Sequence, residues 1–290
     1  GLPLILILNA GGPVELTDIL READNIRAVL NISQPGQEGG TAVADILFGK
    51  AVPEGKLTAT WAERYEDYPC ADSFSYLNGN LEKEEYREGI YVGYRYFDSF
   101  GVKPLFPFGH GLSYTSFEMK FHEIKAKENA LGAEVTVTNT GKSYAGREVI
   151  QVYVSLPRTG TEKEYRRLAG FRKTDSLKPG ESQNVVVEIR QKQLAVFSEE
   201  RQAWIVEKGM YGIWIGGSSA EARLCAFVKV PEEVILEETH RICPREEMFA
   251  ELCMNGSEKD IRRTPAEKEG QLSVYEFIPR REKQKNYKAP

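Results

Sequence analysis

The chain has 290 residues, of which 41% are hydrophobic and 10% aromatic, and it carries a formal net charge of -5. This composition supports about two globular domains with real hydrophobic cores. The balance of 38 basic and 43 acidic side chains, without a basic stripe, gives no electrostatic reason to expect a nucleic acid or an anionic membrane as partner.

The chain opens with a continuous apolar run from Leu2 to Leu8, which ends in Gly11 and Gly12. Such a run predicts a strand that is covered on both faces. It is too short to span a bilayer and lacks the flanks of a signal peptide, which favours a cytoplasmic location. The two glycines are read as a tight turn, because no third glycine and no Gly-Lys-Ser/Thr follows to cradle a phosphate.

The next elements alternate between helix and strand. The apolar spacing predicts a helix from Thr17 that ends near Asp24, and then a buried strand from Ala28 to Ile32. A second helix is predicted over Thr41 to Phe48, ending at Gly49. A strand, helix, strand order favours a parallel α/β layer, here the end of a doubly wound sheet.

The cysteines and histidines show no spacing typical of a metal site. They are Cys70, Cys225, Cys243, Cys253, His110, His122 and His240. The cysteines are interpreted as isolated thiols in a reducing compartment. A pairing of Cys243 with Cys253 across a local turn stays open, and no cofactor or metal is expected.

From Phe117 the hydrophobic period changes to two, which predicts half-buried antiparallel strands. About seven strands over about 115 residues are the size of an immunoglobulin-like sandwich. The predicted strands are Ala133 to Asn139, Val149 to Leu156, Leu168 to Lys173, Asn184 to Ile189, Ala203 to Glu207, Gly212 to Gly216 and Arg223 to Val230.

Beyond Val230 the alternation disappears and the chain becomes rich in charged residues, which indicates a linker or a partly ordered extension. Within it, Glu246 to Cys253 has the pattern of an amphipathic segment, and Leu272 to Ile278 has that of a single docking strand. The basic cluster from Arg280 to Lys285 is interpreted as a solvated segment.

Two blocks carry a family resemblance. Residues 88–117 read EGIYVGYRYFDSFGVKPLFPFGHGLSYTSF, and the earlier block contains QPGQEGG at 34–40, ADILFG at 44–49 and PEGKLTATW at 53–61. In this order they resemble the carboxyl-terminal half of glycoside hydrolase family 3, the β-glucosidase family. The segments VTNTG at 137–141 and LAGF at 168–171 are similar to the fibronectin type III-like domain that closes many members.

The resemblance implies an α+β multidomain chain with three parts. Residues 1–116 are expected to be the end of the family's α/β sandwich domain, 117–230 the fibronectin type III-like β-sandwich, and 231–290 a polar extension or linker. The chain is therefore expected to be the carboxyl-terminal part of a retaining, exo-acting β-glucosidase. Its substrate, a β-glucoside, would bind through a (β/α)8 barrel that lies outside this sequence, either before it or after it in a permuted order.

Hydrolysis of a glycosidic bond needs two carboxyl groups at a matched separation. The resemblance implies that the nucleophile Asp lies on the barrel and the acid Glu ahead of Leu2, so no catalytic residue is assigned in this chain. Glu38 and Glu88 are expected to hydrogen-bond backbone or Arg partners instead. The signature aromatics suggest either a sugar platform or interdomain packing. They are Tyr91, Tyr94, Tyr96, Phe97, Phe106, Phe108, Tyr114 and Phe117, with Arg95 among them.

The competing hypothesis is a non-catalytic structural or carbohydrate-binding accessory module, favoured by the absence of both carboxylates. A homo-oligomer stays open. A lipase or protease is disfavoured, because the chain has no Gly-x-Ser-x-Gly elbow, and a phosphoryl transferase is disfavoured by the lack of a Walker-type loop.

Overall fold

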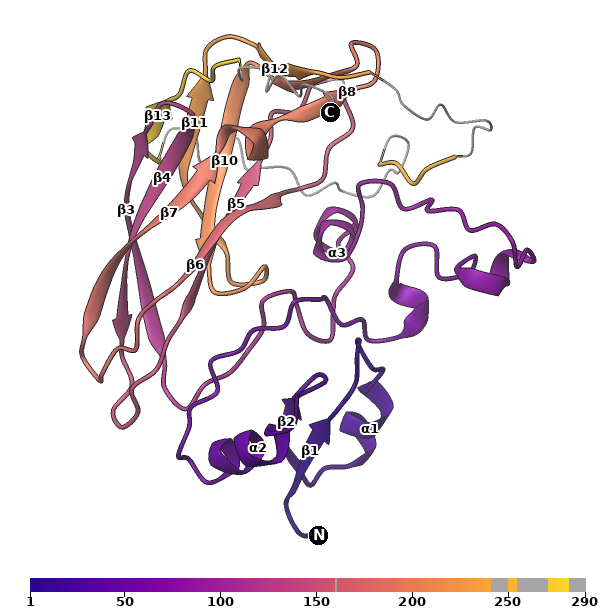
Figure 1. Ribbon diagram of the computed structural model, residues 1–290, viewed down its shortest axis with the longest axis vertical. Helices are drawn as coiled ribbons and strands as arrows, with labels where there is room; N and C mark the ends of the chain where they lie inside the picture. The colour runs from indigo at the N-terminus through magenta and orange to yellow at the C-terminus, as the bar shows by residue number, and fades with distance from the viewer. Residues whose placement is uncertain (160, 241–249, 255–270, 282–290) are drawn as a thin grey trace, which may run out of the picture.

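The computed structural model describes residues 1–159, 161–240, 250–254 and 271–281. A small α/β lobe forms one end of the molecule and a β-sandwich forms the other, as Figure 1 shows. Loops and one short helix connect them along one side. Among the described residues, no helix combines the length and the apolar character needed to cross a membrane.

The α/β lobe contains four elements in the predicted order. They are β1 (Leu4–Leu8), α1 (Thr17–Glu22), β2 (Ile26–Asn31) and α2 (Gly39–Leu47). The two strands pair in parallel, with Leu6 opposite Val29. Gly49 has a φ of 69°, a conformation that glycine adopts without strain just after a helix. The predicted parallel α/β layer and its two helices are confirmed.

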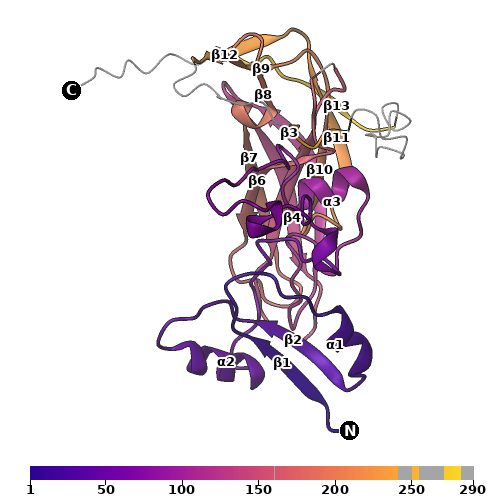
Figure 2. The ribbon, with the colours of Figure 1, turned by 90° about the vertical axis from the view of Figure 1, so that its right-hand side faces the viewer.

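The apolar strand β1 is less covered than its sequence predicts. The relative exposures of Leu4, Ile5 and Ile7 are 49%, 52% and 40%. The sheet of the lobe has two strands, with the short helices α1 and α2 beside it (Figure 2), and in the described residues it leaves much of β1 exposed. The prediction of a strand covered on both faces is wrong for the described residues.

Residues 62–116 connect the lobe to the sandwich. They contain two 3-10 turns, η1 (Tyr65–Asp67) and η2 (Ser75–Asn78), and the helix α3 (Tyr94–Phe100). This helix lies inside the signature block, where the sequence analysis assigned no element. Glycines with positive φ bound it, Gly93 at 56° and Gly101 at 68°. The glycines explain why a helix of only seven residues begins and ends here.

The sandwich contains two facing sheets and a smaller third one. The strand order is β13-β11-β10-β5-β6 in the five-stranded sheet, β3-β4-β7 in the facing sheet and β12-β9-β8 in the third. The elements are β3 (Phe117–Ala126), β4 (Ala130–Asn139), β5 (Val149–Ser155), β6 (Arg167–Lys173), β7 (Ser182–Arg190), η3 (Gln191–Leu194), β8 (Val196–Ser198), β9 (Ala203–Val206), β10 (Gly209–Gly216), β11 (Arg223–Val230), β12 (Val234–Glu238) and β13 (Val274–Glu276).

The main core lies between the two larger sheets. Alternate side chains of β4 and β7, such as Val135 and Val187, meet Val152 and Ile213 from the five-stranded sheet, and all four are buried. Strands with this alternation bury one face and leave the other in water. Each of the seven predicted strands overlaps an observed strand, and the immunoglobulin-like sandwich is confirmed.

The described part of the extension contains two strands. β12 pairs with β9, with Val234 opposite Val206, and β13 pairs in parallel with β11. The prediction of a single docking strand within Leu272 to Ile278 is thereby confirmed. Residues 241–249, 255–270 and 282–290 lie outside the described residues, with half of the predicted amphipathic segment, Cys243 and much of the basic cluster.

Candidate functional site

The two blocks that carry the family resemblance, residues 34–61 and 88–117, lie side by side and are joined by backbone hydrogen bonds. The N–H of Leu57 donates to the carbonyl of His110 at 2.8 Å, and the N–H of Gly109 donates back to Leu57 at 2.8 Å. Further along, Trp61 N–H donates to Phe106 O at 2.9 Å. These pairings satisfy buried backbone groups in segments that have little regular structure. They explain why both blocks are needed to build one unit.

Side chains add to this contact. Lys56 Nζ donates to the carbonyl of Gly111 at 2.9 Å and forms an ion pair with Glu148 at 2.9 Å. The Tyr114 hydroxyl donates to the carbonyl of Ile46 at 2.8 Å, at the end of α2. A shallow hollow of about 390 Å³ lies there, lined by Leu47, Phe48, Gly49, Tyr114 and Tyr144. The lobe and the sandwich are thus joined across the signature blocks.

Several of the signature aromatics are packed inside the protein, whereas Tyr114 is 43% exposed and lines the shallow hollow. Tyr91 is fully buried and Phe97 is nearly so. The ring of Tyr94 lies 5.0 Å from that of Phe108 and 5.6 Å from that of Tyr153 on β5. Its hydroxyl accepts a hydrogen bond from the N–H of Leu168 at 2.6 Å. For these residues, the interdomain packing alternative describes the observed contacts.

The loop between β5 and β6 clamps α3 to the sandwich through Arg166. Arg166 Nε donates to Asp98 Oδ2 at 2.8 Å, and its other nitrogens donate to the carbonyls of Ser219 and Ala222. Its guanidinium carbon also lies 5.2 Å from the centre of the Trp214 ring. A planar, permanently charged group can make all these contacts at once, which lysine cannot.

Glu164, on the same loop, is almost fully buried. It accepts two hydrogen bonds from Arg167, at 2.6 and 3.0 Å, and Arg95 lies 3.8 Å away. Burial by itself would raise the pKa of Glu164, but the two guanidinium groups outweigh it and the pKa lies below its ordinary value. Glu164 is therefore ionised at neutral pH.

This lowered pKa predicts an acid-dependent loss of stability. A carboxylate with a depressed folded pKa contributes stability above its unfolded pKa, and the contribution disappears as the pH falls through the folded pKa. Between pH 6 and about pH 3, the wild-type chain should lose more free energy of unfolding than the Glu164→Gln variant. Urea titrations at both pH values measure this difference. Glu188→Gln, at an exposed pair with Arg190, should retain the wild-type pH dependence; an equal pH dependence in Glu164→Gln would contradict the assignment.

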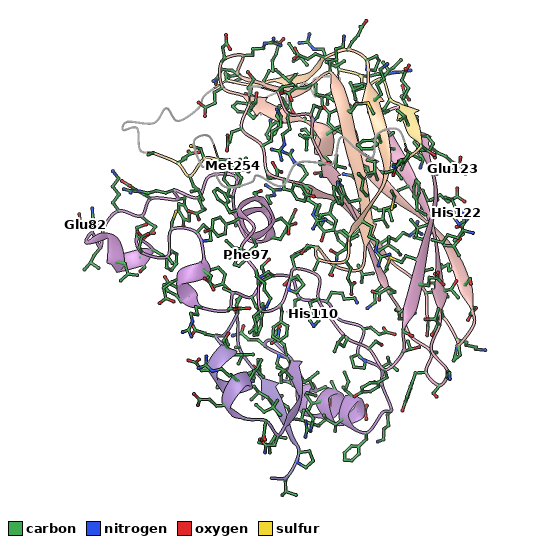
Figure 3. All side chains as sticks on the ribbon, turned by 180° about the vertical axis from the view of Figure 1, so that it is seen from behind. Glu82, Phe97, His110, His122, Glu123 and Met254 are labelled. Atoms are coloured by element: carbon green, nitrogen blue, oxygen red, sulfur yellow. The ribbon has the colours of Figure 1, made fainter. Side chains whose placement is uncertain are left out.

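Glu162 connects three segments. It accepts hydrogen bonds from the Tyr91 hydroxyl and, at 2.6 Å, from the N–H of Met254. The neighbouring Lys163 is buried and pairs with Glu207 at 2.9 Å. Figure 3 shows Met254 near the helix that carries Phe97. Residues 161–167, which end the connection from β5 and include the first residue of β6, are called the clamp loop. The clamp loop thus holds the signature segment (residues 88–117), the sandwich and the extension together.

The structure separates the two acidic residues that the sequence analysis weighed as substitutes for catalytic groups. Glu38 lies at the start of α2 and accepts a hydrogen bond from Thr41 at 3.0 Å, rather than from a backbone or Arg partner. Glu88 lies near Cys70. Burial is the larger cause that raises the pKa of the Cys70 thiol, and the negative charge of Glu88 raises it further. The two residues belong to different segments and have different neighbours.

The histidines and cysteines are also not brought together. His110 lies in the signature block, stacked on Phe106 at 5.3 Å, and His122 lies on β3 on another side of the molecule (Figure 3). Burial lowers the pKa of His110. Within the described residues, no three His, Cys, Asp or Glu side chains could hold a metal ion. Cys70 and Cys225 are free thiols, and the pairing of Cys243 with Cys253 stays a prediction, because Cys243 lies outside the described residues.

The sequence analysis missed the clamp loop. Its run Glu162 to Arg167 reads EKEYRR, an alternation of charges that resembles an ordinary solvated segment. The signal that could have identified it is its place directly before the LAGF segment, where a charged run leads into a predicted apolar strand. Charges beside a core are retained only when they are paired.

Family models match the two halves of the chain. The glycosyl hydrolase family 3 C-terminal domain matches residues 1–114, and a fibronectin type III-like domain matches residues 148–219. Beta-glucosidase A of Butyrivibrio fibrisolvens is 38% identical over 258 residues, which cover 81% of this chain and 30% of that protein. Thermostable beta-glucosidase B of Acetivibrio thermocellus is 38% identical over 237 residues, with 80% and 30% covered.

A solved structure agrees with these relatives. Beta-glucosidase 3B from Thermotoga neapolitana, in complex with glucose, superposes with a TM-score of 0.73 at 40% identity, covering 80% of this chain and 32% of that one. The chain thus spans about 30% of the length of the curated relatives given above. Through its C-terminal domain over residues 1–114 and the fibronectin type III-like domain that follows, the chain belongs to glycosyl hydrolase family 3.

Proposed function

We propose that the chain is the carboxyl-terminal part of a retaining, exo-acting β-glucosidase that removes a terminal glucose from a β-linked glucoside. The observation that carries the proposal is the similarity to β-glucosidases over about four-fifths of the chain, at 38 to 40% identity. The relatives extend well beyond the part that this chain matches. A (β/α)8 barrel outside this sequence would supply the substrate site.

The proposed role of this chain is to shape one wall of that site and to brace the barrel. Residues 1–116, 117–230 and 231–290 are the proposed α/β sandwich portion, fibronectin type III-like domain and extension. A retaining mechanism needs two carboxyl groups about 5–5.5 Å apart. Neither Glu38 nor Glu88 is proposed for either role, because each lies in a separate segment with its own neighbours. No catalytic residue is proposed within this chain.

The isolated chain is therefore expected not to hydrolyse an aryl β-glucoside above the background rate. Release of p-nitrophenol from p-nitrophenyl β-glucoside measures this, with a full-length family 3 β-glucosidase as positive control. Turnover by the isolated chain that is lost in Glu38→Gln or Glu88→Gln would place catalytic groups here and contradict the proposal.

The mass of the native gene product, together with the flanking coding sequence, tests the wider proposal. A product with a barrel before or after this segment supports a complete hydrolase, in standard or permuted order. A native product of about this chain's own length would instead support the accessory-module hypothesis, and binding of β-glucans without turnover would strengthen it.

A further inference from the structure

The last described segment of the chain, residues 271–281, lies along the edge of the sandwich. Within it, β13 pairs in parallel with β11, with Val274 opposite Phe227. The N–H of Phe227 donates to Ser273 O at 3.0 Å, and the N–H of Phe277 donates to Lys229 O at 3.0 Å. The segment thus satisfies backbone groups on a strand that would otherwise form the edge of the five-stranded sheet.

Alternate side chains of this segment point into the sandwich. Tyr275 packs against the main core, and Phe277, at 2% exposure, is part of it. Val274 and Ile278, on either side of these two residues, point outward, with exposures of 50% and 63%. This alternation is that of a true sandwich strand, although only three residues have regular strand geometry. The segment therefore contributes core volume as well as hydrogen bonds.

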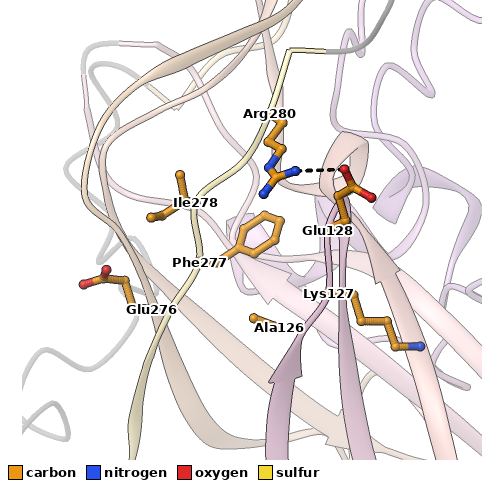
Figure 4. A pocket seen from close by; sticks show the side chains of 7 residues that line it. All are labelled: Ala126, Lys127, Glu128, Glu276, Phe277, Ile278 and Arg280. Carbon is orange, nitrogen blue, oxygen red and sulfur yellow. Dashed lines mark hydrogen bonds and ion pairs between the residues drawn. The ribbon is translucent and has the colours of Figure 1, made fainter.

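A buried glutamine holds the far end of the segment. Gln191, 2% exposed, donates from Nε2 to the carbonyl of Arg280 at 2.9 Å and accepts from the N–H of Arg280 at 3.0 Å. Its side-chain amide thus pairs with one backbone residue as a neighbouring strand would. Arg280 also pairs with Glu128 at 2.8 Å, and Arg281 with Glu238 at 3.1 Å. Figure 4 shows Phe277 beside the Arg280–Glu128 pair.

The hollow beside this segment marks where it leaves the sandwich. It measures about 520 Å³, and the turn between β3 and β4 forms its opposite wall. It is lined by Ala126, Lys127, Glu128, Glu276, Phe277, Ile278 and Arg280. Phe277 lies at the boundary between this hollow and the core, so movement of the segment would connect the two.

The preceding described piece of the extension has an anchor of its own. The N–H of Leu252 donates to Arg87 O at 2.6 Å, and Met254, only 5% exposed, donates its N–H to Glu162. Between β12 and β13, the extension therefore contacts Arg87, which directly precedes the block 88–117, and the clamp loop.

We propose that residues 271–281 are a strap that closes the sandwich. The strap occupies the edge of β11, completes the core with Phe277 and is fastened by Gln191. Its release would open the edge of β11 and one end of the core to water. The extension thus stabilises the sandwich. The strap would have this role whether or not the whole protein is a β-glucosidase.

The test compares two neighbouring apolar residues of the full chain. Phe277→Ala should lower the Tm by about 10 °C, because it removes a buried ring. Ile278→Ala, at the exposed neighbour, should shift it by less than about 2 °C. Amide hydrogen exchange at Phe227 should accelerate at least about tenfold in Phe277→Ala. Exchange of the amides in the centre of β4 should accelerate far less.

Either of two results would show that residues 271–281 are not a separate strap. One is a wild-type Tm and wild-type exchange at Phe227 in the Phe277→Ala chain. The other is equal acceleration in β4 and β11, which would mean that the whole sandwich opens as one unit and that no separate strap exists. If Phe277→Ala does not fold, Phe277→Leu should give a smaller shift of the Tm with the same preference for β11.

Discussion

Replacing Arg166 by methionine is expected to destabilise the chain by about 3–5 kcal/mol. Methionine keeps much of the apolar stem but removes the guanidinium that donates to Asp98 and to the carbonyls of Ser219 and Ala222. Breaking a buried pair costs more than the pair contributes, since the remaining charge and carbonyls stay out of water. The contact with the Trp214 ring is lost at the same time. Urea unfolding followed by tryptophan fluorescence measures the change.

Arg190→Met is the matched control. Arg190 also pairs with a glutamate, Glu188, but both side chains are exposed, at 79% and 52%. Exposed pairs contribute about 0–1 kcal/mol, so this variant should unfold close to the wild type. A loss of similar size in both variants would mean that burial of Arg166 has no special role. A double variant, Arg166→Met with Asp98→Asn, should cost less than the sum of the two single changes, because the two side chains interact directly.

Replacing Gly109 by alanine is expected to destabilise the chain by about 2–6 kcal/mol, the sum of backbone strain and overpacking. Gly109 has a φ of 83°, and a Cβ there would lie 2.3 Å from Nε2 of Gln151. Gln151 cannot easily move, because it is buried and bonded to Gly217 O and to the Tyr153 hydroxyl. Thermal unfolding measures the loss, which would be seen as a fall in Tm.

Gly40→Ala provides the control for this substitution. Gly40 lies in α2, and a Cβ there would meet nothing within 4 Å. Alanine is favoured over glycine inside a helix by about 1 kcal/mol, so this variant should be as stable as the wild type or more stable. If both alanine variants behaved alike, the close contact between Gly109 and Gln151 would not matter for stability.

The positions of Arg166 and Gly109 indicate what the sandwich does for the signature segment. Arg166 holds α3 through Asp98, and Gln151 on β5 supports the turn at Gly109. Both contacts come from the five-stranded sheet or the loop that leaves it. The sandwich therefore fixes the geometry of the signature segment, as the proposed wall of a substrate site would require.

Much of the fold could be predicted because its signals are local. The change from mixed periodicity to period two at Phe117 identifies the start of the sandwich, and the seven predicted strands correspond to β4 to β7 and β9 to β11, whereas β3 and β8 were not predicted as separate strands. The strand β12 was missed because five residues among many charged ones give too short a pattern. The helix α3 was missed because its seven residues depend on flanking glycines and on packing against the sandwich.

The family resemblance, the order of the α/β lobe and the β-sandwich, and the place of most strands could be predicted from the sequence. These features depend on the spacing of apolar, glycine and proline residues along the chain, which the sequence displays directly. The roles of charged residues such as Glu162, Glu164 and Arg166 depend on the folded protein, since a charge is solvated or buried according to partners that are far away in sequence. The place of Phe277 in the core depends on the fold in the same way, because a strand of three residues is stable only against the edge that accepts it.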